Sequence, residues 1–287
     1  MIIIDFNQIA ISNILAQKLT DVDMIRACIL NSIRMYNLKY RNKYGEMVIA
    51  CDGPNTWRRS YYPEYKASRK KGRDDSTFDW QIIFDAMNTI RDEIKANLPY
   101  KVLQFEGCEA DDIIGALARE TQEFGKHEPV MIISSDHDFK QLQKYDNVAQ
   151  FSPMQKKAVV VENARTYLFE HIMKGDSGDG IPNVLSDDDT FVVDGKRQTP
   201  LRAKRIEEWL ENADRLCEVM DNETYRNYQR NLTLIDLCEI PEDIYTKIIN
   251  TFDEQKPAPK MKVLNYLIKK RCNRLVECVE EFYTKTL

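Results

Sequence analysis

Short apolar runs alternate with longer amphipathic stretches through the first half of the chain. The apolar runs cover residues 1–5, 47–51, 101–104 and 130–134. Their length and their content of isoleucine, valine and methionine are typical of buried strands. Helices are expected between them, from the helical spacing of apolar residues, at 21–44, 76–96, 111–124 and 137–144. This alternation predicts an α/β fold with a mainly parallel central sheet flanked by helices.

The pattern changes after two further β-like runs, at 148–151 and 158–161. No convincing core strand follows, and the rest of the chain has the pattern of helices and loops. These helices are expected at 163–173, 202–211, 213–220, 224–235, 241–252, 260–269 and 272–282. We therefore predict an α/β domain at 1–161 and a smaller all-helical domain at 162–287.

Composition and charge exclude some protein classes but do not name a function. The 287 residues are 43% hydrophobic and 30% charged, with a formal net charge of −5, which is ordinary for a globular protein. No apolar stretch approaches the ~18 residues expected of a membrane span. The seven cysteines form no CxxC pair. Buried, reduced thiols in a cytoplasmic compartment are therefore expected.

Acidic residues recur at the ends of the predicted strands and in two later loops. They are Asp5, Asp52, Glu109, Asp111, Asp112, Asp136, Asp138, Asp176 and Asp179. Any one of them alone could cap a helix or hold a turn. Carboxyl ends of parallel strands meet at one sheet edge, however, and so many like charges need cations to neutralise them. Carboxylate oxygens suit Mg²⁺ or Mn²⁺, so the pattern indicates metal-assisted phosphate chemistry.

These acidic motifs are also found in other kinds of site. The DxD of Asp136 and Asp138 could belong to an aspartate-using phosphatase, but Lys140 stands where that motif needs Thr or Val. A sugar-transferase DxD is a pattern of low specificity, and the DSGDG segment lacks the closing Glu of a calcium loop. We expect His137 to point away from the neighbouring aspartates. His127 and His171 are expected to be structural or surface residues.

The segment 54–73 interleaves basic and aromatic residues, with seven basic side chains and a single acid. Cations neutralise phosphates and aromatic rings stack on unpaired bases, so this composition fits a path for a single strand. A Lys or Arg reaching into the cleft could stabilise charge on a phosphate. The alternative is a solvated loop whose tyrosines pack on the protein body.

Three motifs give the chain a resemblance to a known family. They are YPEYKASR at 62–69, EADD together with ISSDHDF, and KGDSGDGIPNV at 174–184. With these motifs the chain resembles the flap endonuclease family of 5′ nucleases, closest in pattern to the RNase H branch of T-even-like bacteriophages. The resemblance implies a PIN-like 5′ nuclease domain with a helical domain that grips duplex through a helix–three-turn–helix motif.

The resemblance also implies a metal centre of two Mg²⁺ ions, for which Mn²⁺ can substitute. The first ion would be held by Asp5, Asp52, Glu109, Asp111 and Asp136. Asp138 would lie near both ions, Asp176 and Asp179 would serve the second, and Asp112 would support the set. Lys66 and Arg69 would contact the scissile phosphate, so the expected catalytic residues are Lys66, Arg69 and Asp138. Tyr62 or Tyr65 would stack on the terminal base.

The expected nucleic-acid surface has two parts. In the basic segment, or arch, it comprises Arg58, Arg59, Tyr62, Tyr65, Lys66, Arg69, Lys70, Lys71 and Arg73. In the helical domain it comprises Lys196, Arg197, Arg202, Lys204 and Arg205. The 185–200 region departs from the family, because the acidic run 187–189 would repel phosphate.

The activity implied is a Mg²⁺-dependent 5′→3′ exonuclease and flap endonuclease that removes RNA primers and adjacent DNA during replication. Expected partners are DNA and RNA·DNA duplexes with 5′ ends, flaps or forks. Single-strand-binding protein and a sliding clamp are further candidates. The protein is expected to be a monomer. Two alternatives stay open: a PIN-type ribonuclease acting on single strands, and a non-catalytic binder of branched DNA.

Overall fold

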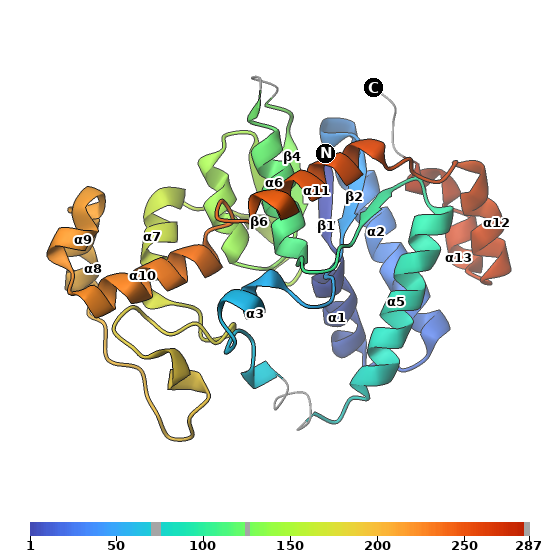
Figure 1. Ribbon diagram of the computed structural model, residues 1–287. Coiled ribbons are helices and arrows are strands. Elements are labelled where there is room, and N and C mark those ends of the chain that lie inside the picture. The colour runs from blue at the N-terminus through green and yellow to red at the C-terminus, as the bar shows by residue number, and fades with distance from the viewer. Residues whose placement is uncertain (70–75, 124–126, 284–287) are drawn as a thin grey trace.

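A six-stranded sheet forms the centre of the computed structural model, which describes residues 1–69, 76–123 and 127–283 (Figure 1). Its strands are β1 (Ile2–Asp5), β2 (Met47–Ala50), β3 (Lys101–Leu103), β4 (Val130–Ile133), β5 (Val148–Ser152) and β6 (Lys157–Val159). The strand order is β3-β2-β1-β4-β5-β6. All neighbours are parallel except β5 and β6, which pair antiparallel. The predicted mainly parallel sheet is confirmed.

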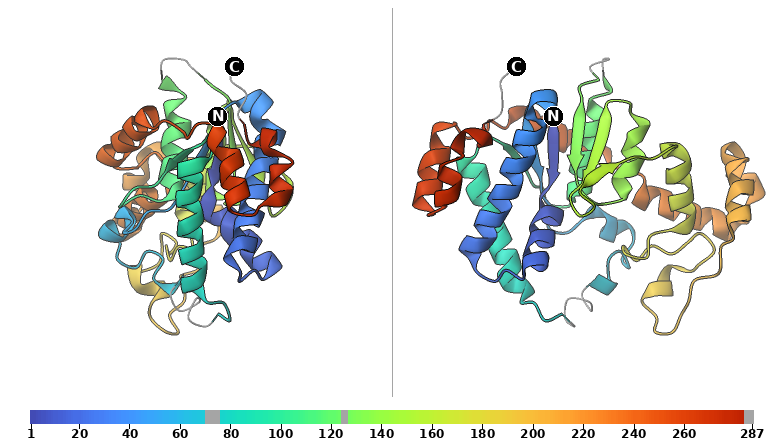
Figure 2. Two further views of the ribbon diagram at one scale, coloured as in Figure 1. Left: turned by 90° about the vertical axis from the view of Figure 1, so that its right-hand side faces the viewer. Right: turned by 180° about the vertical axis from the view of Figure 1, so that it is seen from behind.

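Both faces of the sheet are buried, which explains the continuous apolar runs of its strands. Ile2 and Ile4 point into one core, and Ile3 into the other. The first core is covered by α1 (Phe6–Gln17), α2 (Val22–Tyr44) and α5 (Trp80–Asn97). The second is covered by α6 (Ala110–Glu120) and the 3₁₀ helix η2 (Asp138–Lys144). Figure 2 shows the two layers edge-on.

Helix α1 had no counterpart among the expected elements, because it begins directly where β1 ends. Asp5 is the last residue of β1 and also the N-cap of α1. Its side chain accepts a hydrogen bond from the backbone N–H of Gln8, at 3.0 Å. The chain therefore turns from strand to helix without a loop, and this turn places Asp5 at the carboxyl edge of the sheet.

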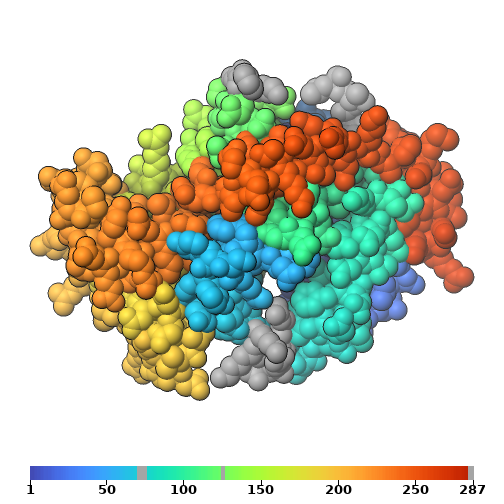
Figure 3. Space-filling model, viewed as in Figure 1, coloured from blue at the N-terminus to red at the C-terminus, as the bar shows by residue number. Residues whose placement is uncertain are grey.

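A helical part extends beyond β6, away from the sheet. It contains α7 (Ala164–Lys174), η3 (Asp188–Phe191), α8 (Ala203–Leu210), η4 (Ala213–Arg215), α9 (Leu216–Val219) and α10 (Asn222–Ile235). Met173, Val184 and Trp209 form one small core there. A second small core joins Ile172 and Leu234 to the segment that follows β2, which contains the short helix α3 (Trp57–Tyr61). Figure 3 shows this segment lying against α10.

The last quarter of the chain returns to the sheet. It contains α11 (Glu242–Glu254), α12 (Met261–Lys269), α13 (Asn273–Val276) and η5 (Val279–Phe282). Ile248 of α11 packs in the α6 core, and Leu267 and Phe282 pack in the α1–α2–α5 core. The Tyr100 hydroxyl donates to the carbonyl of Phe282 at 2.7 Å. These helices therefore complete the two cores of the sheet, although they follow the predicted domain boundary at residue 162.

The cysteines and helix lengths bear on two further predictions. All seven cysteines are free, and Cys51, Cys108 and Cys272 are buried, but Cys217 is exposed, which corrects the prediction that the thiols are buried. Among the described residues, every helix is too short or too polar to span a bilayer.

Candidate metal centre and nucleic-acid face

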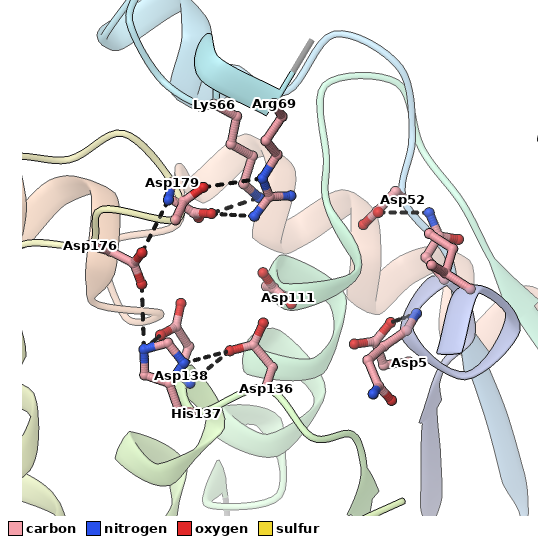
Figure 4. A pocket seen from close by; sticks show the side chains of 14 residues that line it. Asp5, Asp52, Lys66, Arg69, Asp111, Asp136, His137, Asp138, Asp176 and Asp179 are labelled. Atoms are coloured by element: carbon pink, nitrogen blue, oxygen red, sulfur yellow. Dashed lines mark hydrogen bonds and ion pairs between the residues drawn. The ribbon is translucent and has the colours of Figure 1, made fainter. Parts of the chain in front are cut away.

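A cavity of about 290 Å³ lies at the carboxyl ends of the central strands (Figure 4). Its walls carry the carboxylates of Asp5, Asp52, Asp111, Asp136, Asp138, Asp176 and Asp179. Lys66 and Arg69 are the lysine and arginine that line it. The structure therefore brings together seven of the nine acidic residues that the sequence singled out, from five separate segments.

Hydrogen bonds from neighbouring elements fix the carboxylates that follow β1 and β2. The Ser134 hydroxyl, at the end of β4, donates to Asp5 Oδ2 at 2.9 Å. Asp52 accepts from the side chain of Asn7, at 2.7 Å, and from the backbone N–H of Ala110, at 2.9 Å. Since β2, β1 and β4 are adjacent strands, their ends hold each other's side chains in place.

Asp176 and Asp179 come from the turn that ends α7. Gly175 has φ +67°, and a Cβ there would lie 2.3 Å from the Ile181 carbonyl, so the turn requires glycine. Asp176 and Ile181 exchange backbone hydrogen bonds of 2.7 and 2.8 Å that close the turn. The Asp176 carboxylate also accepts from the Asp179 N–H at 3.1 Å. This compact loop aims both carboxylates at the cavity.

Crowding changes the proton affinity of these groups. Burial, with the nearby Asp52 carboxylate, raises the pKa of Asp5 to about 7. Burial and the Asp136 carboxylate raise the pKa of Asp138 to about 7, and they hold the pKa of Asp111 well above its usual range. Burial also opposes ionisation of Asp176, but hydrogen bonds from two histidines outweigh it and lower its pKa. The cavity thus favours cations strongly.

Glu109 and Asp112 lie outside this cavity lining, behind Lys66. Glu109 accepts from Lys66 Nζ at 2.7 Å and from the Tyr65 hydroxyl at 3.0 Å. Burial opposes its ionisation, but Lys66 and Arg58 lower its pKa to about 2. Asp112 closes a capping box with the Glu109 backbone and pairs with Arg58 at 2.8 Å. Both acids pair with protein cations and lie outside the cavity lining, so their place among the metal ligands stays a prediction.

Burial also corrects part of the predicted nucleic-acid surface in the arch. Arg58 is 2% exposed, and Tyr62 and Tyr65 are 4% and 2% exposed. The Tyr62 hydroxyl donates to the carbonyls of Gly180 and Asp188, so its ring packs on the helical part. The prediction that these three side chains meet nucleic acid is wrong for this conformation. A basic-aromatic composition does not distinguish side chains that face solvent from those that anchor the segment.

The remaining arch residues divide between the cavity and solvent. Lys66 Nζ lies 3.4 Å from Asp179, and Arg69 pairs with the same carboxylate. Arg59 is exposed. The predicted contacts at Lys70, Lys71 and Arg73 lie outside the described residues. Lys66 and Arg69 are therefore the arch cations that the structure brings to the carboxylates.

The basic run of the helical part is mostly open to solvent. Arg197, Arg202, Lys204 and Arg205 are exposed. Lys196 instead pairs with Asp189 and, at 2.6 Å, with Asp187. Asp188 pairs with Arg226 and Arg230. The acidic run 187–189 is thus neutralised within the protein, and the repulsion of phosphate expected from it is reduced.

Two histidines at the site were missed as site residues. His137 lines the cavity, with Nε2 3.4 Å from Asp176, so the expectation that it points away is wrong. His171, in the last turn of α7, is buried, and its Nε2 lies within hydrogen-bonding distance of Asp176 Oδ2, at 3.3 Å. Its spacing of five residues from Asp176, across the end of a helix, was the available signal. His127 is exposed and lies apart from the cavity lining.

Comparisons with known proteins agree with this architecture. The family described as "5'-3' exonuclease, N-terminal resolvase-like domain" matches residues 2–170. The chain belongs to the 5′–3′ exonuclease family. A second family, described as "T4 RNase H, C terminal", matches residues 163–282. The junction of these matches lies near the change of pattern in the sequence.

One relative extends these matches to nearly the full length, and another matches about half of the chain. The Ribonuclease H of Enterobacteria phage T4 is 34% identical over 98% of this chain and 95% of its own length. The DNA polymerase I of Rhizobium leguminosarum is 30% identical over 48% of this chain and 13% of its own.

Solved structures share the fold. The T5 D15 protein co-crystallised with metal ions has a TM-score of 0.64 at 17% identity, covering 88% of this chain and 98% of that one. The bacteriophage T5 D15 flap endonuclease in a pseudo-enzyme-product complex with DNA and metal ions has a TM-score of 0.65 at 19% identity, covering 88% and 97%. At these identities the likeness is one of fold.

Proposed function

We propose that the protein is a divalent-metal-dependent 5′→3′ exonuclease and flap endonuclease. Its substrates would be DNA and RNA·DNA duplexes with 5′ ends, flaps or forks, so that RNA primers and adjacent DNA are removed during replication. The observation that carries the proposal is the convergence of seven carboxylates on one cavity, in a chain that belongs to this nuclease family. The phage T4 relative, named a ribonuclease, supports activity on RNA·DNA duplex.

The residues present fit a divalent cation. Asp138 Oδ1 is buried without a hydrogen-bond partner, and the raised pKa values of Asp5 and Asp138 show that the cavity needs positive charge. Asp5, Asp52, Asp111 and Asp136 would hold one ion, and Asp138, Asp176 and Asp179 a second. When bound, such ions lower the pKa of water and stabilise the leaving oxygen. Mg²⁺ is the proposed ion, and Mn²⁺ has the same preference for oxygen ligands.

The chain's own cations would then hold the scissile phosphate. Lys66 and Arg69 reach over the carboxylates and, without substrate, pair with Asp179. A phosphate entering the cavity would accept hydrogen bonds from both, and these donors would stabilise the charge that develops on it. Glu109 holds Lys66 Nζ at 2.7 Å from behind, which fixes where the ammonium points.

Duplex would be held away from the cavity, through its backbone. Arg202, Lys204 and Arg205 form an exposed basic patch around a surface hollow on α8. Contacts to phosphates set the position of a duplex without reading its sequence, as a nuclease specific for structure requires. We further propose a monomer in the host cytoplasm, with single-strand-binding protein and a sliding clamp as partners at the fork.

A matched pair of variants tests this function. Asp136→Asn removes one charge from the cavity, and Asp253→Asn removes one from an exposed position on α11. Both are incubated with 5′-labelled flap and RNA·DNA substrates in Mg²⁺, with EDTA as a blank. We expect Asp136→Asn to lose about 10²-fold or more in rate and Asp253→Asn to keep its rate. Equal rates for Asp136→Asn and the parent protein, or cleavage that persists in EDTA, would refute the proposal.

A further inference from the structure

One end of the cavity differs chemically from the rest, because nitrogen ligands are present there. His137, Asp138, His171 and Asp176 each offer one ligand atom, and these atoms all lie within 4.8 Å of one another. Figure 4 shows His137, Asp138 and Asp176 together at one side of the cavity, with Asp5 and Asp52 across from them. The rest of the cavity offers oxygen ligands, with Asp5 and Asp52 on the far side and Asp111 and Asp136 between the two sides.

Two atoms at this end are buried without a partner. His171 is 8% exposed, and its Nδ1 makes no hydrogen bond. The atom that it faces, Asp138 Oδ1 at 3.5 Å, also has no partner. Buried polar atoms normally find hydrogen bonds, because leaving one unpaired is destabilising. Two such atoms facing each other indicate a ligand that both can bind.

The separations match a small tetrahedral ion. His137 Nε2 lies 3.4 Å from Asp176 Oδ2 and 3.7 Å from Asp138 Oδ1. His171 Nδ1 lies 3.5 Å from Asp138 Oδ1, and its other nitrogen, Nε2, lies 3.3 Å from Asp176 Oδ2, where it can orient that carboxylate. Ligands at ~2.0–2.1 Å from a tetrahedral zinc ion stand about 3.4 Å apart. Imidazole and carboxylate together suit Zn²⁺ and its neighbours, whereas Mg²⁺ prefers oxygen ligands and water.

The positions of the two rings support a built site. The ring centroids of His137 and His171 are 5.0 Å apart. The His137 backbone carbonyl accepts from the Tyr167 hydroxyl at 3.1 Å, which ties the loop after β4 to α7. One histidine comes from that loop and the other from α7, so ordinary folding of the α/β sheet and the helical part brings both donors together.

We propose that His137, Asp138, His171 and Asp176 form a transition-metal site that takes Zn²⁺ in preference to Mg²⁺. Asp138 and Asp176 also belong to the proposed nuclease centre, so this inference deepens the proposed function and rests on it for its consequence. That consequence is a centre with two unlike positions, one for a hard cation held by oxygens and one for a borderline-soft cation held by two imidazoles.

The test measures metal binding by the full-length, metal-stripped protein without substrate. Zn²⁺ is titrated in competition with a chromophoric chelator, and Co²⁺ is added separately to record its visible absorption. The variants are His137→Gln and His171→Gln, with His127→Gln as the matched control at the remaining histidine. Side-chain exposure of 54% at His137 allows that variant to fold, and thermal unfolding of each metal-free variant checks this.

We expect one Zn²⁺ bound, weakened at least about tenfold by either cavity variant and unchanged by His127→Gln. Co²⁺ should give the intense visible bands of a four-coordinate ion in the parent protein, and these should disappear in both cavity variants. Unchanged Zn²⁺ affinity in His137→Gln and His171→Gln, an equal loss in His127→Gln, or only weak six-coordinate Co²⁺ bands would overturn the inference. Failure of Mg²⁺-dependent cleavage with intact Zn²⁺ binding would instead refute the proposed function alone.

Discussion

Replacing Arg58 by Leu tests whether this arginine is a structural ion-pair partner or a nucleic-acid contact. The side chain is 2% exposed and lies 2.8 Å from Asp112 and 3.1 Å from Glu109. Its Nε also donates to the Leu234 carbonyl of α10 at 3.0 Å. One guanidinium therefore neutralises two buried carboxylates and joins the arch, α6 and the helical part.

The magnitude follows from what the substitution leaves behind. Leucine replaces much of the buried side-chain volume but leaves Asp112 without its cation, and leaves Glu109 with Lys66 as its charged partner. Removing one partner of a buried ion pair costs about 3–5 kcal/mol, which is a large share of the ~5–15 kcal/mol typical of a folded domain. Arg58→Lys keeps the charge, but its compact ammonium lacks the planar fork that reaches Asp112, Glu109 and the Leu234 carbonyl, so it should lose about 1–3 kcal/mol.

Urea unfolding, followed by circular dichroism, gives the free energy of unfolding for Arg58→Leu, Arg58→Lys and the control Arg59→Leu. Arg59 is the exposed neighbour, and its replacement should change stability by less than about 1 kcal/mol. The double variant Arg58→Leu, Asp112→Asn should recover part of the loss, because the unpaired charge is gone. A loss below about 1 kcal/mol for Arg58→Leu, with a marked fall in DNA affinity, would refute the structural role.

Three further outcomes are expected from the site. Burial raises the pKa of Asp5 and Asp138 from 3.8 to about 7, so their contribution to stability is present below about pH 4 and is lost as the pH rises through about 7. Thermal unfolding should therefore show a larger stabilisation by Mg²⁺ at about pH 8 than at about pH 5.5. The reverse order would contradict this assignment. Lys66→Met should lower kcat by about 10²-fold or more in single-turnover cleavage with a smaller change in substrate affinity, because the donor to the phosphate is lost. Gly175→Ala should lower the free energy of unfolding by at least about 2 kcal/mol, because φ is +67° and the Cβ would meet the Ile181 carbonyl. A free energy of urea unfolding within about 0.5 kcal/mol of the parent value would show that the turn can relax.

The order of strands and helices could be predicted because it is written in local patterns. Runs such as MIII and VMII are apolar throughout because both faces of their strands are covered, and α2 has apolar residues at helical spacing. The strand-end position of Asp5, Asp52 and Asp136 then places these carboxylates at one edge. This part of the site follows from topology alone, without any knowledge of side-chain packing.

Other features depend on contacts between distant segments, and local pattern does not contain them. Helix α12 has an ordinary amphipathic sequence, and nothing in it tells that Leu267 packs in the same core as Ile2. Tyr65 is surrounded by basic residues in the sequence, yet its hydroxyl is buried between Glu109 and Asp179. His171 becomes a site residue because the turn after α7 brings Asp176 back to it. In each case the role of the residue is set by a contact with a residue that is distant in the sequence or lies beyond the end of its helix.

Three kinds of neighbour reduce the charge of the carboxylates, and each would give way to a divalent ion. Protons are retained by buried groups such as Asp5, imidazoles pair with Asp176, and Lys66 and Arg69 pair with Asp179. A metal ion at Asp179 would take over the neutralisation that the two arch cations supply. Those cations would then be available to a phosphate that lies against the same ions. We therefore expect metal binding and substrate binding to be coupled through these ion pairs, with the arch as the element that carries the coupling.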